Sequence, residues 1–356
     1  MKSVKLIILI VLVAAVSLTL IVLPGCKSTE EAAEEVVEEA IPEEETAEET
    51  EEEAVPAEEM EKPLIANVWL GMGAPYCPPY KETFEAGCEE NGWDLAFFDA
   101  EFDPALQANQ MDEAISMNPD LIILCALDAS GMAAGIKKAF DAGIPVLADH
   151  TPVNAEDEQY TIGYTGPDNY TEGLIAGEML DEALGGEGNI VIITGAAGQE
   201  AAISRPQGVR DTFAELGSNI EILAEQTADW DKAKATAVMA DYITRYGDEL
   251  DGVFGADDTL AVGAFIALEE AGYSKGDLVI VGIGGSKEGL AAIDDGIIFG
   301  TVLQSPVAGA IKAIETIKMA LDQNIQVPDQ LDPYLNYMPL PKITAENVAD
   351  YLPGEW

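Results

Sequence analysis

The chain has 356 residues and carries 66 Asp and Glu against 17 Lys and Arg, which gives a formal net charge of −49 with its single His neutral. So acidic a chain repels phosphate and has few cations to displace counterions, which excludes a nucleic-acid binder that depends on electrostatics. A hydrophobic content of 48% is typical of a globular chain, and the length suffices for two lobes. Most catalytic triads and zinc sites need histidine, so a hydrolase or zinc function would have to use His150.

The first residues predict an export signal, at 1–25. Lys2 and Lys5 precede an apolar run over 6–23, and an uncleaved membrane anchor is the alternative because about 20 apolar residues span a bilayer. The run ends in Leu23-Pro24-Gly25-Cys26, which resembles the lipobox of bacterial lipoproteins, although Pro24 is unusual there. The resemblance implies that Cys26 receives lipid and anchors an extracytoplasmic protein to the cell membrane.

An acidic disordered tether is expected over residues 26–62. Residues 27–62 hold 17 Glu, no Asp and 2 Lys, and a chain of such low hydrophobicity and high like charge remains solvated. An acidic docking or cation-binding tail is the alternative. Residues 63–356 still hold 49 acids and 13 bases, so the acidity also belongs to the body, from a saline habitat or from selection for solubility.

Beyond Cys26 the chain has three cysteines, so at least one thiol is unpaired within the chain. Cys77 and Cys88 flank one predicted helix and would lie about 16 Å apart, beyond disulfide reach. Whether Cys77 meets Cys125 is open, and free buried thiols are the expectation. With no CxxC pair and no metal-ligand spacing, we expect no metal site and no cofactor.

Short apolar runs, each followed by a loop and a helical pattern, recur along the body and predict buried parallel strands. The runs cover residues 65–70, 121–124, 145–148, 190–194, 252–255 and 278–283. Pro78-Pro79 opens one predicted helix, and another covers 258–271 and ends at Gly272. The pattern predicts an α/β fold whose ligand residues follow the carboxyl ends of the strands.

Several polar and aromatic side chains follow these predicted strands. Tyr76 lies in the first loop, Asp149 and His150 follow the third run, and Arg205 is one of three arginines in the chain. Each has a structural alternative: Tyr76 could cap its own core, Asp-His is a common structural pair, and Arg205 could form a surface ion pair of little value. The later candidates are Trp230, Asp257 and Gln304.

Together these segments resemble the sugar-binding proteins of bacterial ABC importers, the periplasmic binding protein class typified by ribose-binding protein. The resemblance extends from about residue 65 to past 325. The matching segments are Pro75-Tyr76, Gly143-Ile144-Pro145-Val146, Gly166-Pro167-Asp168-Asn169, Arg205 before Gly208, Ala228-Asp229-Trp230-Asp231 and Val302-Leu303-Gln304.

The resemblance implies two doubly wound parallel-sheet lobes joined by a three-strand hinge. The N-terminal lobe would hold residues 63–167 and 305–336, and the C-terminal lobe 168–304 and 337–356. The chain would cross near 165–167, 304–306 and 334–337. LacI-type repressors share these lobes, but they carry a helix-turn-helix where this chain has a signal sequence and a tether.

The resemblance also implies the role of each site residue. Tyr76 and Trp230 would hold the sugar ring between their faces, and Arg205 would donate to its ring or anomeric oxygens. Hydroxyls would bind to Asp257, to Gln304 and to His150 or Asp149. The chain departs from the family at Gly284, where an Asp is usual, at Cys77, which replaces an aromatic, and at Ala74, which replaces a polar residue. A standard ribose site is therefore not expected, and a polyol, a modified sugar or a larger ligand with room above Gly284 is as good a candidate.

The resemblance therefore implies a monomeric, membrane-anchored solute-binding protein that captures a pentose, hexose or polyol by hinge closure and delivers it to an ABC permease. The alternative is a sensing subunit that presents a sugar or autoinducer-like signal to a chemoreceptor or sensor kinase. An enzyme is not expected, because His150 lacks an evident nucleophile. Gly282-Ile283-Gly284-Gly285-Ser286-Lys287 matches no nucleotide-binding motif, so no nucleotide or nucleic-acid partner is expected.

Overall fold

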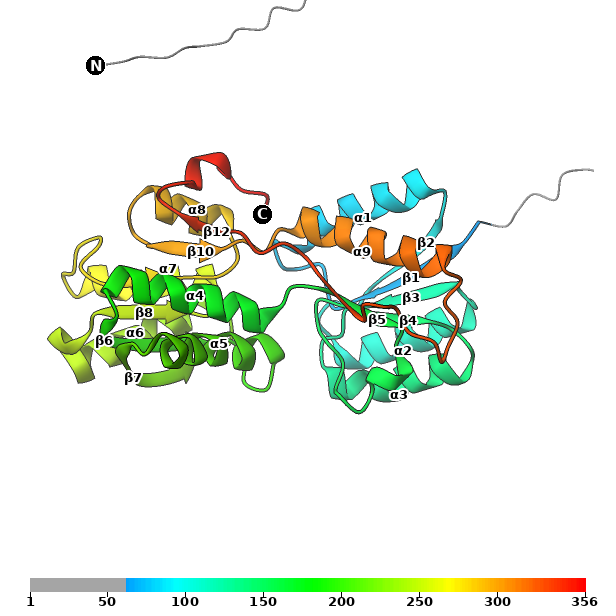
Figure 1. Ribbon diagram of the computed structural model, residues 1–356, viewed down its shortest axis with the longest axis horizontal. Coiled ribbons are helices and arrows are strands. Elements are labelled where there is room, and N and C mark those ends of the chain that lie inside the picture. Colours follow the sequence, from blue (N-terminus) through cyan, green and yellow to red (C-terminus); the bar gives the residue numbers. More distant parts are fainter. Residues whose placement is uncertain (1–61) are drawn as a thin grey trace, which may run out of the picture. The chain divides into compact units, whose positions relative to one another are not determined.

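The computed structural model describes residues 62–356. The predicted signal peptide, Cys26 and residues 26–61 of the predicted tether lie outside the described residues. The described part contains two six-stranded sheets with helices packed against them (Figure 1). Among residues 62–356, no helix is both long enough and apolar enough to cross a membrane.

The first sheet has the strand order β11-β5-β4-β3-β1-β2, and every neighbouring pair is parallel. Its strands are β1 (Leu64–Trp69), β2 (Asp94–Asp99), β3 (Leu121–Leu124), β4 (Val146–Asp149), β5 (Gly163–Gly166) and β11 (Leu335–Tyr337). Helices α1 and α9 lie side by side on one face, and α2 and α3 lie on the other (Figure 1). These helices are α1 (Cys77–Asn91), α2 (Pro104–Ser116), α3 (Ala129–Asp141) and α9 (Pro306–Asp322).

The second sheet has the order β12-β10-β9-β8-β6-β7. Its strands are β6 (Glu187–Thr194), β7 (Asn219–Thr227), β8 (Gly252–Gly255), β9 (Val279–Val281), β10 (Gly300–Val302) and β12 (Lys342–Thr344). Its helices are α4 (Asn169–Leu184), α5 (Glu200–Leu216), α6 (Lys232–Tyr246), α7 (Asp258–Glu270) and α8 (Lys287–Asp294). All pairs are parallel except β10 with β12, an antiparallel edge pair of the kind that mixed sheets tolerate. The predicted α/β architecture of two doubly wound lobes is confirmed.

Burial on both faces explains the continuous apolar run of β1. Ile65 and Trp69 belong to the apolar cluster beneath α1 and α9, whereas Ala66 and Val68 belong to the cluster beneath α2 and α3. Successive side chains of a strand point to opposite faces, so a strand covered on both sides needs apolar residues at almost every position.

The chain crosses between the sheets three times: between β5 and α4, between β10 and α9, and between β11 and β12. The third crossing differs from the prediction near residues 334–337. Residues Leu335–Tyr337 form β11, which pairs in parallel with β5 and so belongs to the first sheet. The crossing therefore occupies residues 338–341, and the predicted lobe boundary between 336 and 337 falls inside β11.

The three described cysteines, Cys77, Cys88 and Cys125, are buried and unpaired, so Cys77 and Cys125 form no disulfide. Burial raises the pKa of the Cys88 thiol to about 12 and also raises the pKa values of Cys77 and Cys125. Buried neutral thiols of this kind behave as small apolar side chains.

Helices α4 and α5 approach each other so closely that only glycine fits at the contact. A Cβ atom on Gly173 of α4 would lie 2.1 Å from the carbonyl oxygen of Arg205, and one on Gly208 of α5 would lie 2.4 Å from the carbonyl oxygen of Tyr170. This approach brings the Arg205 side chain onto the first turn of α4, as described below.

The first prediction concerns this contact. Gly173→Ala should lower the free energy of unfolding by ~1–3 kcal/mol, because the added methyl meets backbone that cannot move aside. The loss should appear although alanine is favoured over glycine inside a helix by about 1 kcal/mol. Urea unfolding measures it, with Glu178→Ala on the exposed face of α4 as the control, which should stay within ~0.5 kcal/mol of the wild type. A Gly173→Ala variant as stable as the wild type would contradict the close approach.

Candidate functional site

The predicted site residues of the first lobe, Tyr76, Asp149 and His150, belong to one hydrogen-bonded group. The Tyr76 hydroxyl lies 2.6 Å from Nε2 of His150, and Nδ1 of His150 lies 2.7 Å from Oδ1 of Asp149. The Tyr80 hydroxyl donates to the other oxygen, Oδ2 of Asp149, at 2.5 Å. Because the carboxylate accepts the proton of Nδ1, a neutral imidazole leaves Nε2 to accept from Tyr76.

Asp149 and His150 differ in burial within this hydrogen-bonded group. Asp149 is fully buried and each of its oxygens already accepts a bond from a neighbouring side chain, so it orients His150. His150 keeps an 11% exposed side chain and has a φ of 58°, in the left-handed region that histidine seldom adopts. Backbone of this kind is often held by its surroundings at functional sites. Both ring nitrogens of His150 are engaged as well, one by Asp149 and the other by Tyr76, so the choice between the two as the ligand contact stays a prediction.

Burial raises the pKa values of both tyrosines in this group. The pKa of Tyr76 lies well above its ordinary value because of burial first and the Asp149 charge second, and the same two causes act on Tyr80. The Tyr80 ring also stacks on Trp69, with ring centroids 4.2 Å apart. Both hydroxyls therefore stay protonated and act as donors.

The second lobe holds Arg205 in a fixed orientation. Its Nε donates to Oδ1 of Asn169 at 3.0 Å and to Oε2 of Glu172 at 2.9 Å, and its Nη1 donates to the carbonyl oxygen of Ala256 at 2.8 Å. Nη2 lies 3.5 Å from Oε1 of Gln304, at the limit of a hydrogen bond. The arginine is 5% exposed, so the alternative of a surface ion pair is wrong.

Glu172, the ionic partner of Arg205, is fully buried. Burial raises the pKa of its carboxyl, and the Arg205 charge opposes that rise. Its second oxygen, Oε1, has no hydrogen-bond partner among the described residues. Glu172 was not identified as a candidate from the sequence, and Asn169 was included only in a family-like segment. Their position in the first turn of the helix that follows the first crossing could have indicated both.

Trp230 is placed by the loop between β7 and α6. A Cβ atom on Gly195 would lie 1.9 Å from the indole ring, so the ring rests on bare glycine backbone. Its Nε1 donates to Oε1 of Gln199 at 2.5 Å, and the Arg205 guanidinium carbon lies 5.9 Å from its ring centroid. The structure thus brings Trp230 beside Arg205.

Asp257 and Gln304 complete the second group. The carboxylate of Asp257 caps α7 by accepting from the backbone N–H of Leu260 at 2.7 Å, and burial raises its pKa to about 7. The backbone N–H of Gln304 donates to the carbonyl oxygen of Gly284 at 3.0 Å. The neighbouring Asp258, which sequence reasoning did not single out, is buried and accepts from Ser286 and Thr301, so it holds the loop around Gly284.

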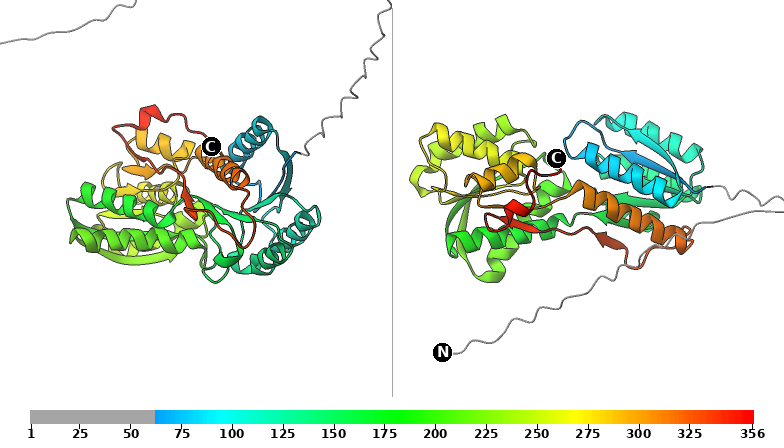
Figure 2. Two further views of the ribbon diagram at one scale, coloured as in Figure 1. Left: turned by 45° about the vertical axis from the view of Figure 1, so that its right-hand side comes forward. Right: turned by 90° about the horizontal axis from the view of Figure 1, so that it is seen from above.

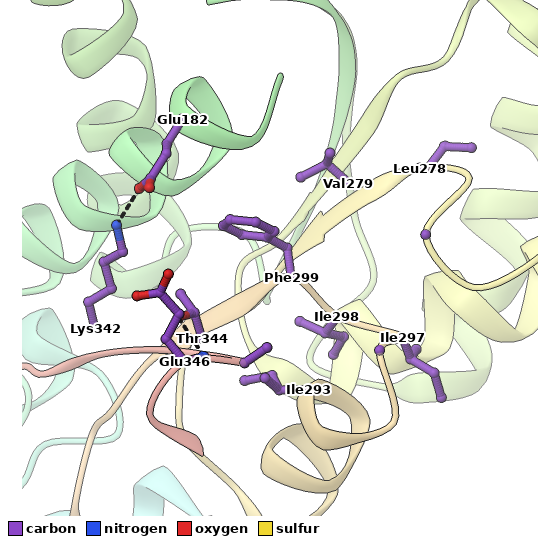
Figure 3. A pocket seen from close by; sticks show the side chains of 13 residues that line it. Glu182, Leu278, Val279, Ile293, Ile297, Ile298, Phe299, Lys342, Thr344 and Glu346 are labelled. Carbon is purple, nitrogen blue, oxygen red and sulfur yellow. Dashed lines mark hydrogen bonds and ion pairs between the residues drawn. The ribbon is translucent and has the colours of Figure 1, made fainter. Parts of the chain in front are cut away.

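A hollow of about 340 Å³ lies away from these residues (Figure 3). It is formed where β9 and β10 begin, whereas the predicted site residues follow the ends of strands. Leu278, Ile293, Ile298 and Phe299 line it, and Lys342 and Glu182 pair at 2.6 Å on its rim. No predicted site residue lines this hollow, so the candidate site is identified by its strand-end side chains and their contacts.

Known proteins resemble most of the described chain. A family model described as "Periplasmic binding protein domain" matches residues 65–325. The xylitol-binding protein of Mycolicibacterium smegmatis is 32% identical over 269 residues, which cover 75% of this chain and 73% of that protein. The ribose import binding protein of Escherichia coli is 28% identical over 263 residues, which cover 74% of this chain and 86% of that protein.

Solved structures agree with this similarity. An ABC transporter solute binding protein from Bacillus halodurans with bound myo-inositol matches with a TM-score of 0.72 at 25% identity, covering 82% of this chain and 97% of that one. A periplasmic ribose ABC transporter protein from Conexibacter woesei matches with a TM-score of 0.74 at 21% identity, over 83% of this chain and 95% of that one, which shows the shared fold.

The second prediction follows from the raised pKa of Asp257. An unfolded Asp titrates near pH ~4, whereas Asp257 titrates near 7 in the folded chain. Between these values the folded state binds the extra proton, so this carboxyl lowers the free energy of unfolding as pH rises from ~4 to ~7. Asp257→Asn keeps the helix cap, because Asn and Asp cap equally well. The variant should therefore gain stability over the wild type as pH rises, with the full gain above pH 7.

Urea unfolding at pH 4.5, 6 and 7.5 measures that difference. Asp128→Asn, which alters an N-cap at an exposed position on α3, is the matched control. An Asp257→Asn difference that does not change with pH would contradict the desolvation of Asp257.

Proposed function

The chain belongs to the sugar-binding type I periplasmic binding protein family of ABC importers, and from this premise we propose that it captures a sugar or polyol in the cleft between its lobes for delivery to an ABC permease. The resemblance found in the sequence is thereby confirmed at the level of the family. Members of this family are solute-binding proteins that act outside the cytoplasm.

The orientation of Arg205 is the observation that carries the proposal. Three contacts, to Asn169, Glu172 and Ala256, hold a nearly buried guanidinium whose Nη2 approaches Gln304. A guanidinium presents several donors in a rigid fork, and its charge is already balanced by Glu172. Such a group suits a neutral ligand rich in oxygen.

The other site residues take the roles that follow from their chemistry. Trp230 and Tyr76 offer aromatic faces to the C–H groups of a sugar or polyol. Its hydroxyls bind to Asp257, to Gln304 and to His150 or Asp149. Donors and acceptors fixed in this way reject ligands that leave one of them unpaired, at a cost of ~1–3 kcal/mol for each. The relatives described above include proteins named for xylitol and ribose and a structure with bound myo-inositol, and we propose the same chemical class for this chain.

Ligand contacts supplied by both lobes give the mechanism of capture. A ligand that touches both groups interacts more strongly with the closed arrangement, and this difference in affinity shifts the population toward closure. The crossings after β5, after β10 and after β11 would act as the hinge. The permease would then recognise the closed form.

We also propose that lipid on Cys26 anchors the protein to the outer face of the cytoplasmic membrane or the periplasmic side of a membrane, with residues 27–62 as the spacer. The support is the lipobox-like sequence that precedes Cys26. An anchored binding protein stays near its permease, which raises its effective concentration there.

The third prediction tests ligand binding. Thermal unfolding is followed with xylitol, D-ribose and myo-inositol, because a ligand at 100 times its Kd adds ~2.7 kcal/mol to the stability of the folded state. At least one solute should raise Tm for the wild type and should fail to do so for Arg205→Ala. Arg210→Ala is the matched control, since Arg210 lies on the same helix and pairs with Glu225.

Loss of Arg205 also leaves the buried Glu172 unpaired, so a second variant keeps the test decisive. Trp230→Ala should abolish the shift as well, whereas Trp93→Ala, which replaces a partly buried tryptophan outside the site, should retain it. A full shift in both folded Arg205→Ala and Trp230→Ala would overturn this site, and no shift in the wild type with any of the solutes would count against the proposed ligand class.

The fourth prediction tests the anchor. When the full chain is expressed in a bacterium fed with labelled palmitate, the label should enter the protein, and Cys26→Ser should lose both the label and the association with the membrane fraction. Ser28→Ala is the control and should keep both. A Cys26→Ser chain that keeps its label would contradict lipid attachment at this residue.

A further inference from the structure

The indole ring of Trp356 lies between the two groups of site residues. On one side it meets Tyr76, with ring centroids 5.6 Å apart and an interplanar angle of 74°. On the other side it covers Gly284, where a Cβ atom would lie 3.2 Å from Cζ2 and 3.3 Å from Cη2 of the indole. Gly284 accepts from the backbone of Gln304, whose side chain approaches Arg205. The ring is therefore linked to both groups.

Backbone and carboxylate contacts fix the segment that carries this ring. The backbone N–H of Lys287 donates to the carbonyl oxygen of Trp356 at 2.6 Å. The Glu355 carboxylate accepts from Oγ of Ser305 at 2.7 and 2.9 Å and from the backbone N–H of Val307 at 3.2 Å, at the start of α9. Both views of Figure 2 show this end of the chain beside the start of α9. Three donors, the backbone N–H groups of Lys287 and Val307 and the hydroxyl of Ser305, thus hold the segment that carries the ring.

The indole N–H of Trp356 is a buried donor with no acceptor among the described residues. By contrast, Nε1 of Trp230 donates to Gln199, and Nε1 of Trp69 donates to the carbonyl oxygen of Gly71. A buried donor without an acceptor costs free energy, so such groups are uncommon and call for a partner from outside the protein. An oxygen atom of a bound solute would supply the acceptor that the protein does not.

Gly284 and Trp356 together leave little room for a side chain at position 284. Gly284 has a φ of 138°, which L-amino acids with side chains rarely adopt, and a side chain there would meet the indole. This side of the site therefore offers a ring and an N–H that donates, and position 284 offers no carboxylate to accept from ligand hydroxyls.

From these contacts we propose that Trp356 is a ligand-binding and specificity-determining residue, and that Gly284 is required because it leaves room for the indole. The proposal rests on the proposed function and names the ligand chemistry more closely. The solute presents a C–H face to the ring and an acceptor oxygen to Nε1, and it needs no carboxylate at position 284 to hold a pair of adjacent hydroxyls.

Isothermal titration of the full chain with xylitol, D-ribose and myo-inositol tests the proposal. For a solute that binds the wild type, Trp356→Phe keeps a ring but removes the donor, so Kd should rise about 5- to 10-fold, as expected for one lost hydrogen bond. Trp356→Ala should raise Kd further, and the change in tryptophan fluorescence that the solute causes should shrink strongly in both variants. Trp93→Phe is the matched control and should keep the wild-type Kd.

The outcomes separate the proposal from the function on which it rests. A wild-type chain that binds none of these solutes counts against both. Binding that is lost in Trp230→Ala but unchanged in Trp356→Phe and Trp356→Ala keeps the proposed function and overturns the role of Trp356. A Trp356→Phe variant with unchanged Tm and weakened binding excludes a merely structural role and supports the proposal.

Discussion

The buried ion pair between Arg205 and Glu172 is the interaction on which the second half of the site depends. Both groups are almost completely enclosed, and removing either would leave a buried charge without its partner. Buried pairs seldom add much net stability, because desolvation offsets the attraction between the charges. This ion pair fixes the orientation of the guanidinium, since Glu172 and Asn169 accept its hydrogen bonds from the first turn of α4. The orientation in turn requires the glycine contact between α4 and α5, because side chains at Gly173 and Gly208 would separate the helices.

The sequence predicted the central strands of both sheets and missed most of the outer ones. The six apolar runs correspond to β1, β3, β4, β6, β8 and β9, which are covered on both faces. The edge strand β7 lacks such a run, and its side chains are only partly buried or exposed. The edge strand β2 does contain one, over residues 95–98, and it was missed. β5 and β11 are short. β5 pairs with β4 and β11 pairs with β5, and a local sequence pattern does not contain this information. The third crossing was placed too early for the same reason.

The site was predictable where chemistry follows the end of a strand and unpredictable where it depends on a distant segment. Tyr76, His150, Trp230, Asp257 and Gln304 each follow a strand or immediately precede a helix, whereas Arg205 lies inside α5, and family resemblance supplied the roles that are proposed for all six. The enclosure of Asp149 could not be predicted, because it depends on the contact with Tyr80, which lies 69 residues away in the chain. Trp356 belongs to no recognisable motif and lies 72 residues beyond Gly284 in the sequence. Only the fold shows that its indole occupies the space that the missing side chain of Gly284 leaves.

The electrostatics of the two groups favour a neutral solute although the chain as a whole is strongly acidic. Glu172 balances the charge of Arg205, and Asp149 is enclosed by the hydroxyl of Tyr80 and the imidazole of His150. Asp257, with a pKa of about 7, is only partly ionised at neutral pH, and position 284 carries no carboxylate. The excess negative charge of the surface would repel an anionic solute, while no unbalanced carboxylate in the site would hold a cationic one tightly. Hydroxyl-rich neutral molecules remain, because they interact through hydrogen bonds and C–H faces, which are the contacts that Arg205, Trp230, Tyr76 and Trp356 can make.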